Sequence, residues 1–390
     1  MTQPARMKFG IFMAPFHRPG ENPTLALERD LELIEWLDTL GFDEAYVGEH
    51  HSAGWETICS PEVFLASAIA RTKRIMLGTG VVSLPYHNPY MVANRMVLLD
   101  HLSRGRAILG VGPGALASDA LMFGINPERQ REMMDEALGV IIRLFESTVP
   151  LTVKSDWFEL NEAILQLRPY QQPSMPIAVA SVQSPAGVQV AGKHGAGVLS
   201  LSIPRDTVRK TTLKELWAIG EETAEKHGKT LRREDWSLVV SVHLAESRQE
   251  AIEQVRRASG RETLEYFGQT LGHPAPDVAP DKVVDFMVER NLWMIGTPDD
   301  CIAYIEELQE MSGGFGGFMI RTSDWGTREQ ILHSYELLAR YVMPHFQGTL
   351  AGIHASQQWA SERKVSLQEN RLAGLRRADS AYYGKGGSQG

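Results

Sequence analysis

The chain has 390 residues, of which 43% are hydrophobic and 22% charged, and its formal net charge is −9. This is an ordinary globular composition, and the negative charge argues against nucleic acid as a partner. No apolar run approaches the roughly 18 residues of a membrane span, and the N-terminus has no signal-peptide pattern. The two cysteines, Cys59 and Cys301, lie far apart. We therefore expect a cytoplasmic protein with no membrane contact, disulfide framework or zinc site.

Short apolar or β-branched runs alternate with helical patterns along most of the chain. Strands are predicted at residues 8–14, 44–48, 75–82, 107–111, 177–180, 197–202, 237–244 and 315–321. These runs are apolar throughout rather than alternating, as expected of parallel strands that are buried on both faces. Helices are predicted at residues 24–40, 61–71, 90–102, 127–145, 185–193, 206–227, 248–259 and 327–341.

Eight strands alternating with eight helices predict an α/β fold, a (β/α)8 TIM barrel, over residues 7–345. An open, doubly wound sheet is the alternative. Insertions are expected after the fourth and seventh strands, at 147–176 (a small hairpin) and 258–300, and such insertions commonly cover the catalytic mouth. Residues 346–390 are predicted to form a C-terminal helical extension and flexible tail, packing on the barrel or on a second subunit.

The second predicted strand ends in Glu49-His50-His51, at the end of the barrel where active sites lie. Neighbouring residues on a strand point to opposite faces, so both histidines can point inward only if the strand has already ended. An imidazole can move a proton near neutral pH, and we predict His50 as the catalytic residue, oriented by Glu49 or by the loop. A structural histidine is one alternative. A metal pair is another, although it would favour His-x-His, and no metal is expected.

Glycines follow the third and fourth strands, namely Gly80 before Val81, and then Gly112 and Gly114. Glycine lets a backbone approach a flat ring closely, although a simple turn explains the third strand equally well. Gly112 to Ala117 matches the pattern G-x-G-x-x-A. A Rossmann site is rejected because no helix is expected to open at once and no ribose-binding acid follows.

The fifth strand ends in Ser181 and Gln183, and Ser184-Pro185 then opens a helix. Free N–H groups and the positive end of the helix dipole make this a plausible seat for a monophosphate, while an ordinary N-cap explains Ser184 alone. No Walker lysine motif is present, so a nucleoside triphosphate is not implied. A hydrophobic substrate is predicted from apolar side chains near the strand ends. These side chains are Phe12, Met13, Phe16, Trp55, Met122 and Trp325.

Taken in order, these stretches resemble the flavin-dependent, bacterial-luciferase-like monooxygenases. The matching segments run from residue 7 to residue 345 and include 41–51, 77–81, 99–106, 109–114 and 181–191. Within the family, residues 48–62 and 84–89 most resemble the limonene 1,2-monooxygenase-like members. Baeyer–Villiger enzymes acting on camphor-derived diketones share several of the same stretches.

The resemblance implies a two-component system in which a separate NAD(P)H:flavin reductase supplies reduced FMN. The barrel would use it with O₂ to place one oxygen atom in a small, apolar, cyclic terpenoid-type substrate, by epoxidation or Baeyer–Villiger oxidation. A homodimer or homotetramer is expected. Three rivals remain: an F420-dependent hydride transferase on the same barrel, a flavin-binding protein without catalysis, and a metal-dependent barrel hydrolase.

The resemblance also implies roles for particular residues. It places His50 beside the flavin, and it makes Gly80-Val81 a backbone contact that is often a cis peptide bond. It assigns Gly112 and Gly114 to the flavin loop. The implied phosphate loop contains Ser181, Gln183 and Ser184.

The chain departs from the luciferases at two positions. They carry a reactive cysteine where it has Gly112 and an arginine where it has Pro113. Luciferase-type chemistry on long aldehydes is therefore not expected. The phosphate is expected to rely on backbone N–H groups or on another arginine.

Overall fold

The structure is a computed structural model, and it describes residues 6–14, 16–182, 184–201, 211–274 and 276–383. The chain separates into two compact units, Met1–Met343 and Pro344–Gly390. Each unit is described by itself.

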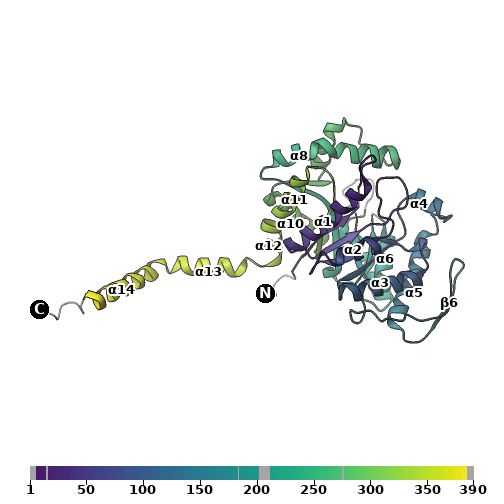
Figure 1. Ribbon diagram of the computed structural model, residues 1–390, viewed down its shortest axis with the longest axis horizontal. Helices are drawn as coiled ribbons and strands as arrows, with labels where there is room; N and C mark the ends of the chain where they lie inside the picture. The colour runs from purple at the N-terminus through teal and green to yellow at the C-terminus, as the bar shows by residue number, and fades with distance from the viewer. Residues whose placement is uncertain (1–5, 15, 183, 202–210, 275, 384–390) are drawn as a thin grey trace. The chain divides into compact units, whose positions relative to one another are not determined.

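The first unit is a closed barrel of eight parallel strands surrounded by helices (Figure 1), which confirms the predicted fold class. The order around the barrel is β1-β2-β3-β5-β8-β9-β10-β12, and β12 pairs with β1 to close it. The strands are β1 (Lys8–Met13), β2 (Glu44–Val47), β3 (Met76–Thr79), β5 (Ala107–Gly112), β8 (Ile177–Ser181), β9 (Gly197–Ser200), β10 (Trp236–Leu244) and β12 (Gly317–Arg321). A two-residue strand, β4 (Val82–Ser83), continues from β3 along β5.

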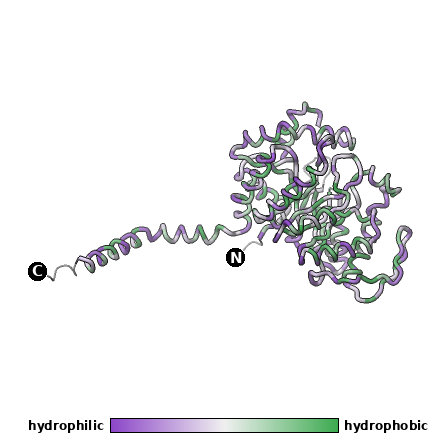
Figure 2. The backbone as a smooth tube through the Cα atoms, in the orientation of Figure 1, coloured by the Kyte–Doolittle hydropathy of each residue, from purple (hydrophilic) through white to green (hydrophobic). Residues whose placement is uncertain are grey.

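The strands owe their apolar sequences to burial on both faces. All nine residues of β10 and all six of β5 are buried, because helices cover the outer face and other strands' side chains fill the inside. Figure 2 shows hydrophobic segments running through this part of the chain. One inner cluster takes a residue from each of six strands. Its members are Tyr46, Ile108, Ala178, Leu199, Val239 and Met319.

The helices of the first unit largely follow the predicted pattern. They are α1 (Pro23–Leu40), α2 (Pro61–Ile69), α3 (Pro89–Ser103), α4 (Ala117–Met122), α5 (Gln130–Glu146), α6 (Pro185–His194), α7 (Leu213–Lys226), α8 (Arg248–Arg261), α9 (Val283–Glu289), α10 (Pro298–Ser312) and α11 (Arg328–Leu337). Three have no counterpart among the eight predicted helices. Helix α4 opens five residues after Gly112, where no helix was expected to open at once, α9 lies in the second insertion, and α10 begins with a capping box at Thr297. The predicted helix 206–227 falls partly outside the described residues.

Both predicted insertions are present. The first contains the hairpin of β6 (Leu151–Lys154) and β7 (Glu159–Ala163). The second continues α8 directly into a π-helix (Glu262–Thr270), then α9 and β11 (Trp293–Gly296), which pairs with the last residues of β10. The π-helix packs Tyr266 against Phe16 and Trp55, near the C-terminal ends of the strands.

The second unit is built from helices α13 (Ala351–Glu362) and α14 (Lys364–Tyr383), while α12 (Met343–Gln347) spans the boundary. Residues 351–383 are thus helical almost throughout. Within the described residues, no helix combines the length and the apolarity that crossing a bilayer requires.

Candidate active site

A cavity of about 520 Å³ lies at the C-terminal ends of the barrel strands. Its walls come from the segments that follow β2, β3, β5 and β8, from the end of β12, and from the π-helix of the second insertion. His50 and Ser184 both line this one cavity, although they follow strands far apart in the sequence. Parallel strands bring their C-terminal ends to one mouth, which is why these segments meet.

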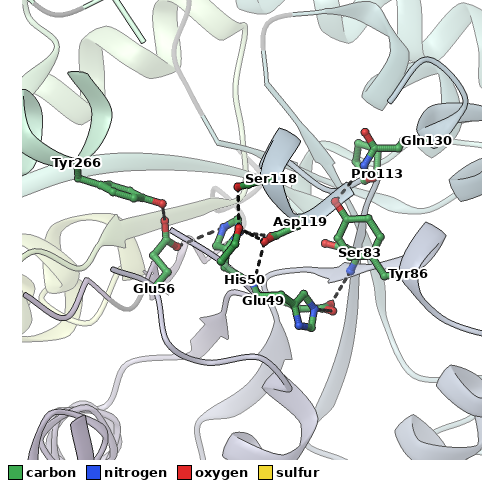
Figure 3. Close-up of polar contacts among 12 residues, drawn as sticks. Glu49, His50, Glu56, Ser83, Tyr86, Pro113, Ser118, Asp119, Gln130 and Tyr266 are labelled. Carbon is green, nitrogen blue, oxygen red and sulfur yellow. Dashed lines mark hydrogen bonds and ion pairs between the residues drawn. The ribbon is translucent and has the colours of Figure 1, made fainter. Parts of the chain in front are cut away.

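His50 lies between two carboxylates (Figure 3). Its Nδ1 is 3.2 Å from Oδ2 of Asp119, and its Nε2 is 3.4 Å from Oε2 of Glu56. Burial by itself lowers the pKa of His50, but the hydrogen bond with Asp119 and the nearby negative charges outweigh it. The pKa of His50 is therefore raised above its ordinary value, so the imidazole carries its proton at higher pH than a free histidine.

Each carboxylate beside His50 is held by other groups. Asp119, on α4, is 1% exposed and accepts hydrogen bonds from the hydroxyl of Ser52 and the backbone N–H of His51. Burial raises the pKa of Asp119, yet the hydrogen bonds from His50 and Ser52 bring it below its usual range. Glu56 accepts a 2.6 Å hydrogen bond from the hydroxyl of Tyr266. Burial, together with the charge of Glu56, raises the pKa of Tyr266 well above its ordinary value.

Glu49, one of the two alternatives named for orienting His50, forms no hydrogen bond with it in the described chain. Its carboxylate instead accepts from Nε2 of His51 at 2.7 Å, from Nε2 of His87 at 2.6 Å and from the backbone N–H of Ser83 at 2.8 Å. Burial by itself raises the pKa of Glu49, but these hydrogen bonds outweigh it, so the pKa of Glu49 lies below its ordinary value. His50 is contacted instead by Asp119 on α4 and by Glu56 in the loop that follows β2.

Glu49, His51 and His87 also place one ligand atom each within 4.8 Å of one another, close enough to surround a metal ion. Both histidines direct a ring nitrogen at Glu49, and Nδ1 of His87 lies 3.4 Å from the guanidinium of Arg95. A nearby guanidinium disfavours a divalent cation, whereas the same contacts form a self-consistent hydrogen-bond cluster. That no metal is used stays an expectation.

The predicted backbone contacts divide into two groups. Gly80 and Val81 line the cavity and are joined by a cis peptide bond, the geometry that the resemblance implies. Gly114 also lines it, with a φ of 89° that favours glycine. Gly112 is not among the described residues of the lining. A Cβ there would press on the side chain of Val81, so Gly112 makes room for Val81.

The loop around Gly114 is fixed by two side chains. A Cβ at this position would overlap the hydroxyl of Tyr86, which accepts a 3.0 Å hydrogen bond from the side-chain amide of Gln130. The same amide donates to the backbone carbonyl of Pro113 at 2.9 Å. Burial raises the pKa of Tyr86 to about 12, so its hydroxyl stays protonated.

The predicted phosphate residues are only partly at the cavity. Ser184 lines it as the N-cap of α6, and its side chain makes no capping hydrogen bond. Ser181 is 1% exposed and lies outside the described lining, and its hydroxyl finds no partner in the described part of the chain. Gln183 falls outside the described residues. Arg131, in the first turn of α5, lines the cavity and was not predicted.

The predicted apolar wall needs correction. Phe12 and Phe16 line the cavity, but Met13 is fully buried in the core and Met122 is 65% exposed. Trp55 and Trp325 are not in the described lining, but each packs on a residue that is: Trp55 on Tyr266, and Trp325 on Arg321. Further large apolar or aromatic lining residues were not singled out from the sequence, and they include Leu116, Met134, Leu201, Tyr266, Phe267 and Leu271.

A parallel barrel whose strand ends enclose a largely apolar cavity, with a titratable histidine in its wall, has the architecture of a TIM-barrel enzyme. The model of the luciferase-like monooxygenase family matches residues 7–313. The chain belongs to this family and is an oxidoreductase of the monooxygenase class.

Two relatives match most of the chain. It is 46% identical over 351 residues to limonene 1,2-monooxygenase of Rhodococcus erythropolis, covering 88% of each chain. It is 45% identical over 361 residues to 4-hydroxyprotoasukamycin monooxygenase of Streptomyces nodosus subsp. asukaensis, covering 92% of this chain and 97% of the relative. The two relatives act on different molecules, so similarity alone selects no substrate.

Solved structures share the fold at lower identity. The oxygenating constituent of 3,6-diketocamphane monooxygenase from Pseudomonas putida, in complex with FMN, has a TM-score of 0.74 at 23% identity and covers 87% of this chain and 98% of its own. An F420-dependent secondary alcohol dehydrogenase has a TM-score of 0.63 at 21% identity, covering 86% and 98%. These likenesses bear on the fold alone.

Proposed function

We propose that this protein uses reduced FMN, supplied by a separate NAD(P)H:flavin reductase, and O₂ to place one oxygen atom in a small, mostly apolar substrate. The observation that carries the proposal is that His50, the Gly80-Val81 backbone and Ser184 all line the same cavity. The relatives named above are monooxygenases, and one solved neighbour contains FMN. Epoxidation and Baeyer–Villiger oxidation are both open.

The residues present fit a flavin mononucleotide. A cavity of about 520 Å³ is in the range of cofactor and ligand pockets. The backbone of Gly80 and Val81 lines the cavity, where a flat ring could lie against it. At another part of the wall, the N-terminus of α6 at Ser184 and the guanidinium of Arg131 provide donors for a phosphate. Arg131 forms no ion pair within the described chain, which leaves its charge available.

The position of Arg131 in α5 supports this assignment. The first turn of a helix favours acidic side chains, because the helix dipole is positive there. A cation at this point is unfavourable for the helix itself. Its charge is better explained by an anion in the cavity, which makes Arg131 our candidate for the other arginine that was expected as an alternative to backbone N–H groups.

Bound reduced FMN would supply the electrons that activate O₂. The chain's own contribution is to hold the ring at Gly80 and Val81, to hold the phosphate at Ser184 and Arg131, and to keep water away with apolar walls. His50 holds a proton between Asp119 and Glu56, and its raised pKa lets it act as a general acid near neutral pH.

The proposal is tested by O₂ uptake with FMN, NADH and a generic flavin reductase, across a panel of cyclic alkenes and cyclic ketones. Substrate-dependent uptake, with one ¹⁸O atom from ¹⁸O₂ in the product, is expected. Tight FMN binding without any substrate-dependent uptake would instead identify a flavin-binding protein.

An F420-dependent hydride transferase is the second candidate, since an enzyme of the same fold carries an F420-acetone adduct. Reduction of F420 by an alcohol, measured at the deazaflavin absorbance, would support this candidate and contradict the FMN proposal. Elemental analysis for zinc and iron tests the barrel hydrolase.

A further inference from the structure

Arg321 places a guanidinium in an otherwise apolar part of the cavity. It is the last residue of β12, it lines the cavity, and its side chain is 16% exposed. In the closed strand order, three strands separate β12 from β5 in either direction, so the two lie opposite each other across the barrel. Gly114 follows β5 and Gly80 follows β3. Arg321 therefore stands across the mouth from the wall assigned to the flavin.

The guanidinium is held in one orientation by four neighbours. Its Nη1 forms an ion pair with Glu262, and its Nε donates to the hydroxyl of Ser241 at 2.8 Å. The rings of Phe16 and Trp325 lie 5.2 and 5.5 Å from its Cζ. Glu262 also accepts a 2.9 Å hydrogen bond from the indole of Trp325, which fixes the position of the carboxylate that pairs with Arg321.

One end of this guanidinium is left for a ligand. Within the described chain, Nη2 of Arg321 donates no hydrogen bond, while Nη1 and Nε are already engaged. A donor in a cavity with apolar walls loses free energy unless an acceptor meets it. The wall beside Arg321 is aromatic, since Phe16 lies against its guanidinium and packs in turn on Tyr266 and Phe267.

The charge of the pair limits what the acceptor can be. Arg321 is neutralised by Glu262, so together they have no net attraction for a free anion. The remaining donor suits a neutral oxygen, and the aromatic walls suit an apolar skeleton. A pure hydrocarbon would leave the donor unsatisfied, and a carboxylate would lie close to Glu262.

We propose that Arg321 is a substrate-anchoring residue that donates a hydrogen bond from Nη2 to a neutral oxygen of the substrate. The substrate class is accordingly a cyclic, mostly apolar molecule that already carries a carbonyl or hydroxyl oxygen. This inference rests on the proposed oxygenase function. It adds that the oxygen to be inserted goes to a part of the substrate away from the anchored group.

The test compares carvone, a cyclic terpene ketone, with limonene, which has the same skeleton without the oxygen. Dissociation constants are measured by titration calorimetry on the protein without flavin. Carvone should bind the wild type about tenfold more tightly, the usual worth of one hydrogen bond to a charged group. Without such a donor, the more water-soluble ketone would bind more weakly than limonene.

The variant Arg321→Met should abolish the preference, bringing the two constants within about twofold or reversing them, and Arg321→Lys should retain part of it. Comparing two ligands in one protein cancels any loss of folded molecules. Arg261→Met is the matched control. Arg261 is the last residue of α8, directly before Glu262, and it is not part of the described lining. It should keep the tenfold ratio.

The proposal would be overturned if the wild type bound carvone and limonene equally well, or if Arg321→Met kept the tenfold preference for carvone. Both outcomes are decisive whether or not the protein oxygenates any substrate. Loss of FMN binding in Arg321→Met with the ratio unchanged would assign Arg321 to the flavin instead. The ligand measurement needs neither flavin nor O₂, so its failure is distinguishable from a failure of the oxygenase function.

Discussion

Asp119 contacts His50 from helix α4, with Oδ2 3.2 Å from Nδ1. His50 follows β2, whereas Asp119 belongs to the short helix that follows β5. Glu56 approaches the other ring nitrogen at 3.4 Å and is itself tied to Tyr266 in the second insertion. The histidine is therefore held by three separate segments, which fixes both its ring orientation and its affinity for a proton.

The first prediction concerns His50 itself. His50→Ala should lower turnover by about 100-fold or more, because a positioned acid contributes about this much to a proton transfer. Steady-state O₂ uptake and product formation measure the effect, and a flavin titration checks that binding is intact. His333→Ala, on the exposed face of α11, is the control and should stay near wild type. A loss of less than about threefold would exclude His50 as the acid.

The second prediction concerns Asp119→Asn, which removes the charge beside His50 while keeping the side chain's shape. Asp119 raises the pKa of His50, so the pKa of His50 should be lower in the Asp119→Asn variant. If protonated His50 is the active form, activity is lost as pH rises through this pKa. The alkaline limb of the pH–kcat profile should therefore move to lower pH.

This shift can be followed directly in the His50 ring resonances by NMR titration. Ser118→Ala is the matched control, because Ser118 neighbours Asp119 on α4 and contacts Ser52 rather than His50. It should leave the limb in place. A profile that moves to higher pH in Asp119→Asn contradicts the assigned role.

The third prediction separates phosphate binding from ring binding. Arg131→Met should weaken FMN binding by about 10- to 100-fold, the usual loss for one charge-assisted hydrogen bond to phosphate. Riboflavin lacks the phosphate, so its affinity should change less than about twofold. Fluorescence titrations with both flavins measure the difference. Equal losses for FMN and riboflavin would show that the substitution disturbs the pocket in general.

The fourth prediction concerns stability far from the cavity. The buried carboxylate of Asp38 accepts hydrogen bonds from the backbone N–H groups of Lys73, Arg74 and Ile75 at 2.9, 2.8 and 2.7 Å. Burial raises its pKa, but these three bonds lower it below the ordinary value of 3.8. Asp38→Asn should reduce the free energy of unfolding by about 1–3 kcal/mol at pH 7.

The pH dependence of this loss has a defined sign. A carboxylate with a lowered folded-state pKa contributes stability above its unfolded pKa and loses it as pH falls through the folded value. The difference between wild type and Asp38→Asn should therefore shrink below about pH 3.8. Urea unfolding at a series of pH values measures it. Asp379→Asn, on exposed α14, should show no difference at any pH.

The sequence by itself determined the barrel. Runs such as β10, whose nine residues are all buried, must be apolar at every position, because a parallel strand inside a barrel has no face toward water. Glycine and proline then marked where helices start and end, as at Gly41 and Pro185. The candidate histidine was also readable, since His50 comes directly after a strand end.

Only the tertiary structure decided what surrounds that histidine. Asp119 meets His50 from α4, which was too short to give a periodic pattern. Glu56, Arg131 and Arg321 line the same cavity from segments with no fixed spacing to His50. Neighbouring Glu49, one of the two alternatives that the sequence offered for orienting His50, accepts hydrogen bonds from His51 and His87 instead. Hydrogen-bond partners depend on side-chain direction over a few ångströms, and the folded backbone sets that direction, whereas hydrophobic periodicity acts locally along the chain.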